Sequence, residues 1–321
     1  MPCRMFALLL AVLAISPCPA AAQILPAGPI RIIVPAAPGG ASDLSLRSLA
    51  ELLQKALGQP VVVENRAGAD GILAAQAAAL ANGDGGTLLL GTTTTQVANA
   101  VLRRRLPYDP ARDFAPVTMV GTTALVLLVH PDVPAGSVQE LIAHAQANPG
   151  KLTFASSYAS SRMAGELFKQ MARIDLLNVP YKTTQGATTD LVGGQIQMMF
   201  GDLWSALPHI RSGRLRALAV TTPQRVPFAA HLPTVAESGL PGYEMIGWAG
   251  LFVPSRTPPA IIARLNAELV PLISSPEFRK RMLEAGSEVS PGTPEAFRDH
   301  LRSEVQKWRR LAEQAHIEIA D

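Results

Sequence analysis

The sequence predicts an α/β protein built as two domains, and three observations support that prediction. Short runs of branched apolar residues alternate with segments of helical period about every 25–30 residues, a pattern typical of parallel βα units. The chain has 321 residues, a length that suits two domains. Three helical segments close the chain with no predicted strand between them, so we expect them to cover a sheet formed earlier in the sequence.

Composition and charge exclude several classes of protein. Hydrophobic residues make up 48% of the chain and charged residues 17%, which excludes a disordered protein. A formal net charge of +3 is too small to indicate a nucleic-acid partner. We therefore expect a globular protein with no nucleic-acid partner, and the charge does not indicate a membrane partner. After the first 22 residues no apolar run reaches about 18 residues, so we expect the rest of the chain to be soluble.

The first 22 residues have the features of a secretory signal peptide. Arg4 precedes an apolar run over residues 5–15, and three alanines at 20–22 suit cleavage by signal peptidase after Ala22. The alternatives are an uncleaved anchor, a buried core helix and a lipoprotein modified at Cys18. Both cysteines, Cys3 and Cys18, lie in this segment, so we expect the exported chain to have no disulfide and no cysteine-based metal site.

The N-terminal third contains three predicted strands with helices between them. The apolar run at residues 30–34 ends at Pro35, and Ser42 with Asp43 could cap the helix that follows. Leucines at helical spacing continue that helix as far as Gly58, a residue typical of helix ends. The next predicted elements are a strand at 61–64, a helix at 72–81 and a strand at 87–91.

The alternation continues through the middle of the chain, and the end of the chain is helical. Predicted strands lie at 125–129, 152–155, 177–179, 197–200 and 215–221, and predicted helices at 137–146, 163–172 and 188–192. A proline-rich connector at 222–242 leads to an extended segment at 245–253, and then to helices at 259–273, 276–285 and 294–311. We expect residues 23–124 and 241–321 to form a discontinuous first lobe, with residues 125–240 inserted as the second.

A glycine-rich loop between the first strand and the first helix is the most informative local feature. Residues 35–43 read PAAPGGASD. Two adjacent glycines let the backbone approach a ligand closely, and the following helix N-terminus offers unpaired N–H groups and a positive dipole end. This combination favours an anion such as a carboxylate. The alternative is an ordinary tight βα turn in which Asp43 only caps the helix.

Three further polar clusters follow predicted strands. They are the four threonines at 92–95, the serines at 156, 157, 160 and 161, and the Gly201-Asp202 pair. Ligands of open α/β sheets bind at the carboxyl ends of strands, where neutral hydroxyl groups can donate to an oxyanion. Each cluster taken alone is also typical of a solvated loop or a helix cap.

The charged residues, the histidines and the sequence motifs give little further indication of function. Arg66 and Lys182 are possible carboxylate ligands, with structural ion pairs or solvent exposure as the alternative, and Arg103 to Arg105 suit an exposed helix end. None of the six histidines lies three or four residues from another, and no P-loop, GxSxG or HExxH motif is present. We expect no metal, no cofactor and no catalytic residue.

Taken together, these segments resemble the substrate-binding proteins of tripartite tricarboxylate transporters, the Bug family. The match runs from about Pro29 to the C-terminus. It is carried, in order, by PIRIIVPAAPGGASD, GQPVVVENRAGADG, TLLLGTTTT, LPYDPARDFAPVTMV, NPGKLTFASS, AGELFK, VPYK, TDLVGGQIQMMF, ALPHIRSGRLRALAVT, LPTVAESGLPGYE and GWAGLFVPSRTP.

The resemblance implies a type II-like periplasmic binding protein fold. Each lobe would be a mainly parallel sheet flanked by helices, with a ligand cleft at the hinge. The protein would be a periplasmic monomer that passes a small organic carboxylate, unchanged, to membrane transporter subunits. In the family the first loop holds a carboxylate largely through backbone N–H groups and water. That mode carries over to Pro38, Gly39, Gly40, Ala41, Ser42 and Asp43.

The same resemblance makes the later polar clusters the other walls of the cleft: Thr93, Thr94, Ser156 and Ser157. The second-lobe wall departs from the family pattern at three places. Thr183 replaces a usual glycine, Gly201-Asp202 replaces Asp-Asn, and the serine loop is shorter and carries Tyr158. Asp202 would disfavour a second ligand carboxylate, and Tyr158 could offer a ring to an aromatic acid, which points away from citrate.

Two other functions remain compatible with such a fold. A sensory protein would bind the same ligand and report to a signalling receptor, and only neighbouring genes would separate it from a transport protein. A periplasmic enzyme would need an acid–base pair in the cleft, for which Asp43 and Asp202 are the residues available.

Overall fold

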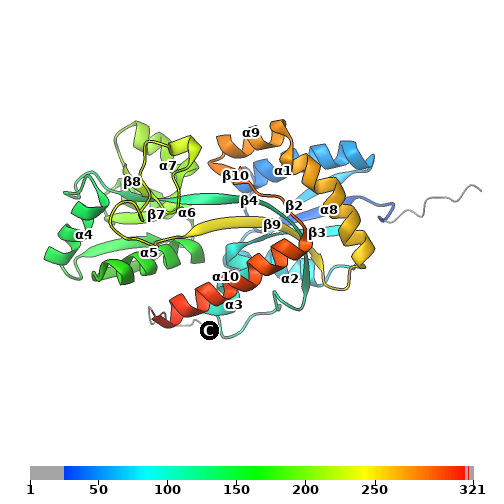
Figure 1. Ribbon diagram of the computed structural model, residues 1–321, viewed down its shortest axis with the longest axis horizontal. Helices are drawn as coiled ribbons and strands as arrows, with labels where there is room; N and C mark the ends of the chain where they lie inside the picture. Colours follow the sequence, from blue (N-terminus) through cyan, green and yellow to red (C-terminus); the bar gives the residue numbers. More distant parts are fainter. Residues whose placement is uncertain (1–24, 315–316, 318–321) are drawn as a thin grey trace, which may run out of the picture.

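The computed structural model describes residues 25–314 and residue 317. The predicted signal peptide at 1–22 lies outside these residues. Ten strands of the described chain join in one sheet of order β2-β1-β3-β9-β4-β7-β5-β6, with β8 and β10 pairing additionally with β4. Figure 1 shows the two lobes side by side, connected by the long strands β4 and β9. The α/β two-lobe fold class is therefore confirmed.

Lobe 1 brings together elements from the N-terminal third and from the C-terminal part of the chain (Figure 1). It contains β1 (Ile30–Val34), α1 (Ala41–Leu57), β2 (Val61–Asn65), η1 (Ala69–Gly71), α2 (Ile72–Ala79), β3 (Thr87–Thr92), η2 (Thr94–Ala98), α3 (Asn99–Leu102), β9 (Ile246–Pro254), α8 (Pro259–Ser274), α9 (Pro276–Glu284), β10 (Ser287–Val289) and α10 (Pro294–Gln314).

Lobe 2 is built on the second half of β4 (Phe114–Val129). Its other elements are α4 (Val138–Ala147), β5 (Leu152–Ser156), α5 (Ala159–Ala172), β6 (Leu176–Pro180), α6 (Thr184–Val192), β7 (Met198–Asp202), α7 (Leu203–Arg211), β8 (Arg216–Val220) and η3 (Pro227–Ala229). At the start of α4 the Ser137 hydroxyl accepts a hydrogen bond from the Glu140 N–H, which is one half of a capping box.

The sheet differs from the expectation in two ways. The pairs β1–β2, β1–β3, β5–β6 and β5–β7 are parallel as expected, but β4 and β9 pair antiparallel with each other and with every strand beside them, so each lobe has a mixed sheet. A strand does lie among the final helices, because β10 pairs with β4 between α9 and α10. The pairing partner lies more than 160 residues away, and three residues carry no strand pattern of their own.

Helices cover both faces of the sheet, and the two faces differ. On one side a continuous apolar core runs through both lobes, from Phe252 and Phe297 in lobe 1 to Phe154 and Phe168 in lobe 2. On the other side the core is split into one cluster under α1, α8 and α9 and a separate cluster under α6 and α7. Relative movement of the lobes therefore disrupts less packing on the side of α1 and α7.

Gly165 provides a test of the lobe 2 core. It lies in α5 where the helix packs on Phe154, and a β-carbon there would stand 2.5 Å from Cδ2 and 2.7 Å from Cζ of that ring. Alanine favours a helix over glycine by about 1 kcal/mol, but overpacking costs about 1–3 kcal/mol. We expect Gly165→Ala to lower the free energy of unfolding by about 1–2 kcal/mol in urea denaturation, on balance of those terms.

The control for this prediction is the double variant Gly165→Ala, Phe154→Leu. The smaller leucine removes the ring that the new methyl group would meet, so the alanine should cost less in that background. An equal cost in both backgrounds would show that the ring is not the cause.

Candidate functional site

The loop that follows β1 reaches solvent at the start of α1. Pro38, Gly39, Gly40 and Ser42 are exposed. Gly39 has φ of +84°, a conformation that favours glycine, and Gly40 takes the N-cap position with extended backbone. No side chain caps α1. The exposed start of this 17-residue helix is therefore suited to an anion.

The prediction that Ser42 or Asp43 caps this helix was wrong, since α1 begins at Ala41, one residue before Ser42. Asp43 instead turns back into the protein and is 1% exposed. Its Oδ2 accepts hydrogen bonds from the Gly39 N–H at 2.9 Å and the Arg47 Nε at 3.0 Å, and its Oδ1 accepts one from the Asn65 Nδ2 at 2.9 Å. Asp43 therefore fixes the conformation of the glycine loop from the buried side of that loop.

The electrostatics of Asp43 favour its charged form. Burial raises the pKa of Asp43, but hydrogen bonds from Arg47, Gly39 and Asn65 and the positive charge of Arg47 outweigh burial and lower the pKa below its usual value. Asn65 also donates to the Ala36 carbonyl at 3.1 Å, so the end of β2 is tied to the same loop. These hydrogen bonds indicate that Asp43 positions the glycine loop.

The threonines of the loop after β3 differ in whether their hydroxyl groups form hydrogen bonds within the protein. Thr93 is 2% exposed, and its Oγ1 accepts a hydrogen bond from the Trp248 N–H at 2.9 Å. Thr92 and Thr95 bond to each other across the start of η2. Thr94 is half-buried, and its hydroxyl has no hydrogen-bond partner within the described part of the chain. Of the two predicted residues, only Thr94 has a free hydroxyl.

The second-lobe loops are arranged in a similar way. Ser156 is buried and donates to the Asn178 Oδ1 at 2.7 Å, whereas the Ser157 hydroxyl lies 3.1 Å from the Thr184 hydroxyl at the start of α6. Thr183 is exposed and caps α6 by accepting the Gly186 N–H. The sequence gives no sign that Thr184 belongs to this group, because its place beside Ser157 depends on the parallel pairing of β5 with β6.

Tyr158 and Asp202 lie close together at the ends of β5 and β7. Burial raises the pKa of Tyr158 well above its usual value, and the charge of Asp202 raises it further. Asp202 is half-buried and caps α7, because its Oδ1 accepts the Ser205 N–H at 2.9 Å. Its second carboxylate oxygen has no partner among the described residues. Lobe 2 therefore brings one phenol and one carboxylate near each other, at the ends of the neighbouring strands β5 and β7.

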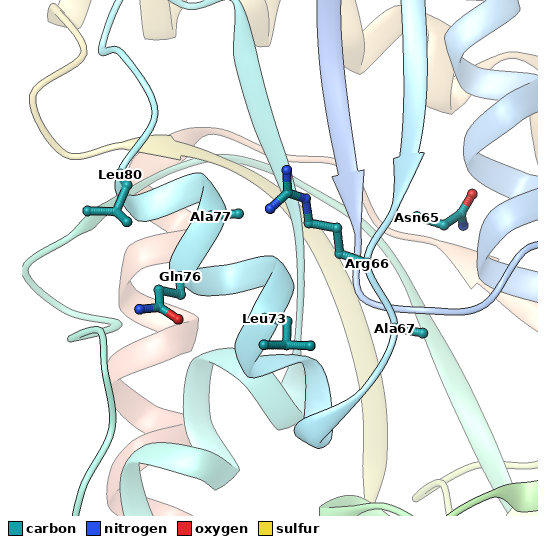
Figure 2. A pocket seen from close by; sticks show the side chains of 7 residues that line it. All are labelled: Asn65, Arg66, Ala67, Leu73, Gln76, Ala77 and Leu80. Atoms are coloured by element: carbon teal, nitrogen blue, oxygen red, sulfur yellow. The ribbon is translucent and has the colours of Figure 1, made fainter.

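The two charged side chains singled out from the sequence lie elsewhere. Arg66 forms an ion pair with Glu64 at 2.6 Å, and Lys182 is exposed. Arg66 lines an open surface hollow of about 580 Å³ between the end of β2 and α2, together with Asn65, Ala67, Leu73, Gln76, Ala77 and Leu80 (Figure 2). The hollow is mainly apolar, and of the residues that the sequence suggested as carboxylate ligands it is lined by Arg66, which is already paired with Glu64.

The described part of the chain shows neither a cluster of metal ligands nor a membrane-spanning helix. Residues 25–314 and 317 contain no group of three or more His, Cys, Asp or Glu side chains that could hold a metal ion. In the same residues no helix is long and apolar enough to cross a membrane.

Solved structures similar to this chain include two proteins in complex with a carboxylate and one periplasmic binding protein. Rpa4515 of R. palustris, solved with adipate, has a TM-score of 0.84 and 33% identity over 91% of this chain and 99% of its own. MatC from Rhodopseudomonas palustris, solved with bound malate, has a TM-score of 0.79 and 30% identity over 89% and 99%. The periplasmic binding protein BugD has a TM-score of 0.80 and 33% identity over 91% and 99%.

Sequence comparison gives the same family. Protein BugT of Bordetella pertussis is 37% identical over 293 residues, which are 90% of this chain and 90% of BugT. The model of the tripartite tricarboxylate transporter family receptor matches residues 45–317. The chain therefore belongs to the tripartite tricarboxylate transporter receptor family, the Bug family of periplasmic solute-binding proteins.

Proposed function

We propose that this protein captures a small organic carboxylate between its lobes and delivers it to the membrane subunits of a tripartite transporter. The observation that carries the proposal is the exposed, uncapped start of α1 at Gly39 and Gly40, held in place by Asp43. Backbone N–H groups at such a site bind a carboxylate without a buried countercharge. Adipate and malate in the similar structures support a ligand of this class.

The organisation of the chain fits that role. We propose a first lobe of residues 23–124 with 246–321 and a second lobe of residues 125–245, so the boundary expected at 240 moves to Ile246, because the Met245 N–H still donates to the Thr221 carbonyl. We also propose a ligand cleft between the lobes and export to the periplasm after removal of residues 1–22. Thr94, Ser157 and Thr183 would complete the wall around the ligand, and Tyr158 and Asp202 would face its far end. Closure of the lobes would signal that the site is filled.

An enzyme on this fold is not favoured by the geometry. Such an enzyme would use Asp43 and Asp202 as its acid–base pair, but both carboxylate oxygens of Asp43 already accept hydrogen bonds from the protein. A buried carboxylate with a lowered pKa is a poor proton carrier near neutral pH. We therefore propose binding without chemical conversion.

A thermal-shift screen tests the ligand class. Residues 23–321 are mixed with mono-, di- and hydroxycarboxylates, and with amines and sugars as comparison sets. A carboxylate at 100-fold its Kd should add about 2.7 kcal/mol to the free energy of unfolding and raise the Tm. Stabilisation by sugars or amines alone would refute the proposal, and mass spectrometry of the recovered ligand would show whether it is unchanged.

A further inference from the structure

The two strands that connect the lobes change partners within very few residues. On β4, Thr123 pairs with Ser287 of lobe 1, whereas Leu125 bonds to Thr221 of lobe 2. On the second connection, the Met245 N–H donates to the Thr221 carbonyl of lobe 2, whereas Trp248 already bonds to Thr93 of lobe 1.

The strands therefore cross between the lobes at Ala124 and at Ile246 with Gly247. Ala124 and Ile246 are paired with each other across the two strands, so the crossing is one compact hinge. Trp248 is the first lobe 1 residue that follows this hinge on β9.

Trp248 is held from two sides. Backbone pairing of β3 with β9 ends at Thr92 and Ala249, and the Thr93 hydroxyl then accepts the Trp248 N–H, so a side chain continues the pairing by one residue. The indole Nε1 of Trp248 donates to the Glu304 Oε2 of α10 at 3.4 Å. Trp248 and Glu304 are both buried, and the edge-on rings of Phe297 and His300 lie 5.5 Å from the indole ring.

Lys307 extends this contact beyond the hinge. Its Nζ lies 3.7 Å from the Glu304 Oε1 and 3.0 Å from the Glu244 Oε1. Glu244 lies on the lobe 2 side, between Met245 and Tyr243, whose hydroxyl donates to the Ala164 carbonyl of α5 at 2.9 Å. Figure 1 shows α10 running obliquely from lobe 1 toward the side of the molecule on which lobe 2 lies.

We propose that Thr93 is a positioning residue for ligand binding, which joins the threonine loop to the hinge strand through Trp248 and Glu304. The inference rests on the proposed function, because it makes carboxylate affinity depend on a residue that does not touch the ligand. Thr94, with its free hydroxyl, belongs to the same loop. Fixing that loop before the ligand arrives removes the ordering cost from binding.

The test compares two substitutions of Thr93. Thr93→Val keeps the shape but leaves the buried Trp248 N–H without an acceptor, whereas Thr93→Ser keeps the hydroxyl. By isothermal titration with the carboxylate found in the screen, we expect Thr93→Val to weaken binding about tenfold. Thr93→Ser should stay within about twofold of the parent protein, since the acceptor remains. Equal affinity for the valine variant, or equal loss in both variants, would overturn the proposal.

A spectroscopic measurement separates positioning from general damage. The sequence has three tryptophans, and 5-fluorotryptophan labelling gives each a ¹⁹F resonance, with Trp248→Phe to assign the one of interest. In the ligand-free protein, Thr93→Val should shift the Trp248 resonance and leave that of Trp308 in place, and Thr93→Ser should shift neither. An unmoved Trp248 resonance in the valine variant would overturn the proposal.

A second variant covers the case in which Thr93→Val does not fold. Glu304→Leu fills the same buried space but removes both the acceptor of the indole and the ion-pair partner of Lys307. It should shift the Trp248 resonance and weaken binding about threefold. Unchanged affinity in Glu304→Leu would count against the chain of contacts. Failure of the parent protein to bind any carboxylate would refute the proposed function instead, and the ligand-free ¹⁹F comparison would still decide the role of Thr93.

Discussion

Replacing Asp43 with alanine should abolish ligand binding and lower the free energy of unfolding by about 3 kcal/mol, because hydrogen bonds to a charged group contribute about 1.5–3 kcal/mol each and do not add fully. The substitution leaves the Gly39 N–H, the Arg47 Nε and one Asn65 N–H without their acceptor. Arg47 is half exposed and can bind water instead, so the expected loss stays near the contribution of a single strong hydrogen bond.

The binding loss has a separate cause. Without Asp43, nothing fixes the Gly39 N–H, and the loop at Gly39 and Gly40 loses the shape in which its backbone can meet a carboxylate. Urea denaturation measures the stability and isothermal titration the affinity. A variant that loses stability but binds normally would show that the loop does not depend on Asp43.

Asp84 offers a matched control. It is exposed, and its Oδ1 accepts the N–H of another glycine, Gly86, at 2.8 Å, in a turn outside the predicted ligand loops. Asp84→Ala removes the same kind of bond and the same charge. We expect it to cost about 1 kcal/mol or less and to leave affinity unchanged, because the group is solvated.

The contribution of Asp43 should also depend on pH. Its pKa in the folded protein lies below the usual value of 3.8, so the unfolded chain binds the proton first as pH falls. The stabilisation is complete above about pH 5 and is lost as the pH falls below 3.8 through the lowered pKa. The difference in unfolding free energy between the parent protein and Asp43→Ala should therefore be constant from pH 5 to 7 and narrow in acid. A constant difference down to pH 2 would contradict this account.

Asp43 also shows where sequence reasoning reaches its limit. The paired glycines and their βα position predict an anion site at Gly39 and Gly40, but helix-capping preferences assign Asp43 the wrong task. Its actual partners include Asn65, which lies 22 residues away and reaches it only because β2 pairs beside β1. The type of residue was informative, and the direction of its side chain depended on tertiary contacts.

Local sequence patterns also explain which strands could be predicted and which were missed. The strand at Ile30–Val34 was predicted with its exact bounds, because Pro and Gly limit an apolar run on both sides. The first half of β4 was missed, because Pro116 and Gly121 interrupt its pattern where the pairing with β9 has irregular register. The four threonines at 92–95 look equivalent in sequence, and only the contact with Trp248 separates Thr93 from Thr94.

Removing the charge of Asp202 should change which carboxylates bind. Asp202 has one oxygen on the Ser205 N–H and one without a partner in the described chain, and it lies close enough to Tyr158 to raise the pKa of that phenol. If the first ligand carboxylate sits at Gly39 and Gly40, a second one in the far half of the site meets this negative charge. We expect Asp202→Asn to increase affinity for dicarboxylates about tenfold, from removal of a like charge at partly screened distance.

Asparagine is chosen because it caps a helix as well as aspartate does, so α7 should keep its start and the Tm should change little. Affinity for monocarboxylates should stay the same, since these ligands place no charge near residue 202. The measured quantity is the ratio of dicarboxylate to monocarboxylate affinity, by isothermal titration at low and high salt. The gain should shrink as salt rises, because screening already weakens the repulsion in the parent protein.

Asp190→Asn provides the comparison that decides the cause. It removes the same charge from lobe 2, but on α6, where the Asp190 carboxylate accepts the Tyr181 hydroxyl at 2.7 Å. A general effect of net charge would make both variants bind dicarboxylates more tightly, whereas a local repulsion changes the ratio only in Asp202→Asn. A rise in monocarboxylate affinity as large as that for dicarboxylates would show instead that Asp202 opposes the first carboxylate. The ligand would then lie the other way round, with its anionic end toward lobe 2.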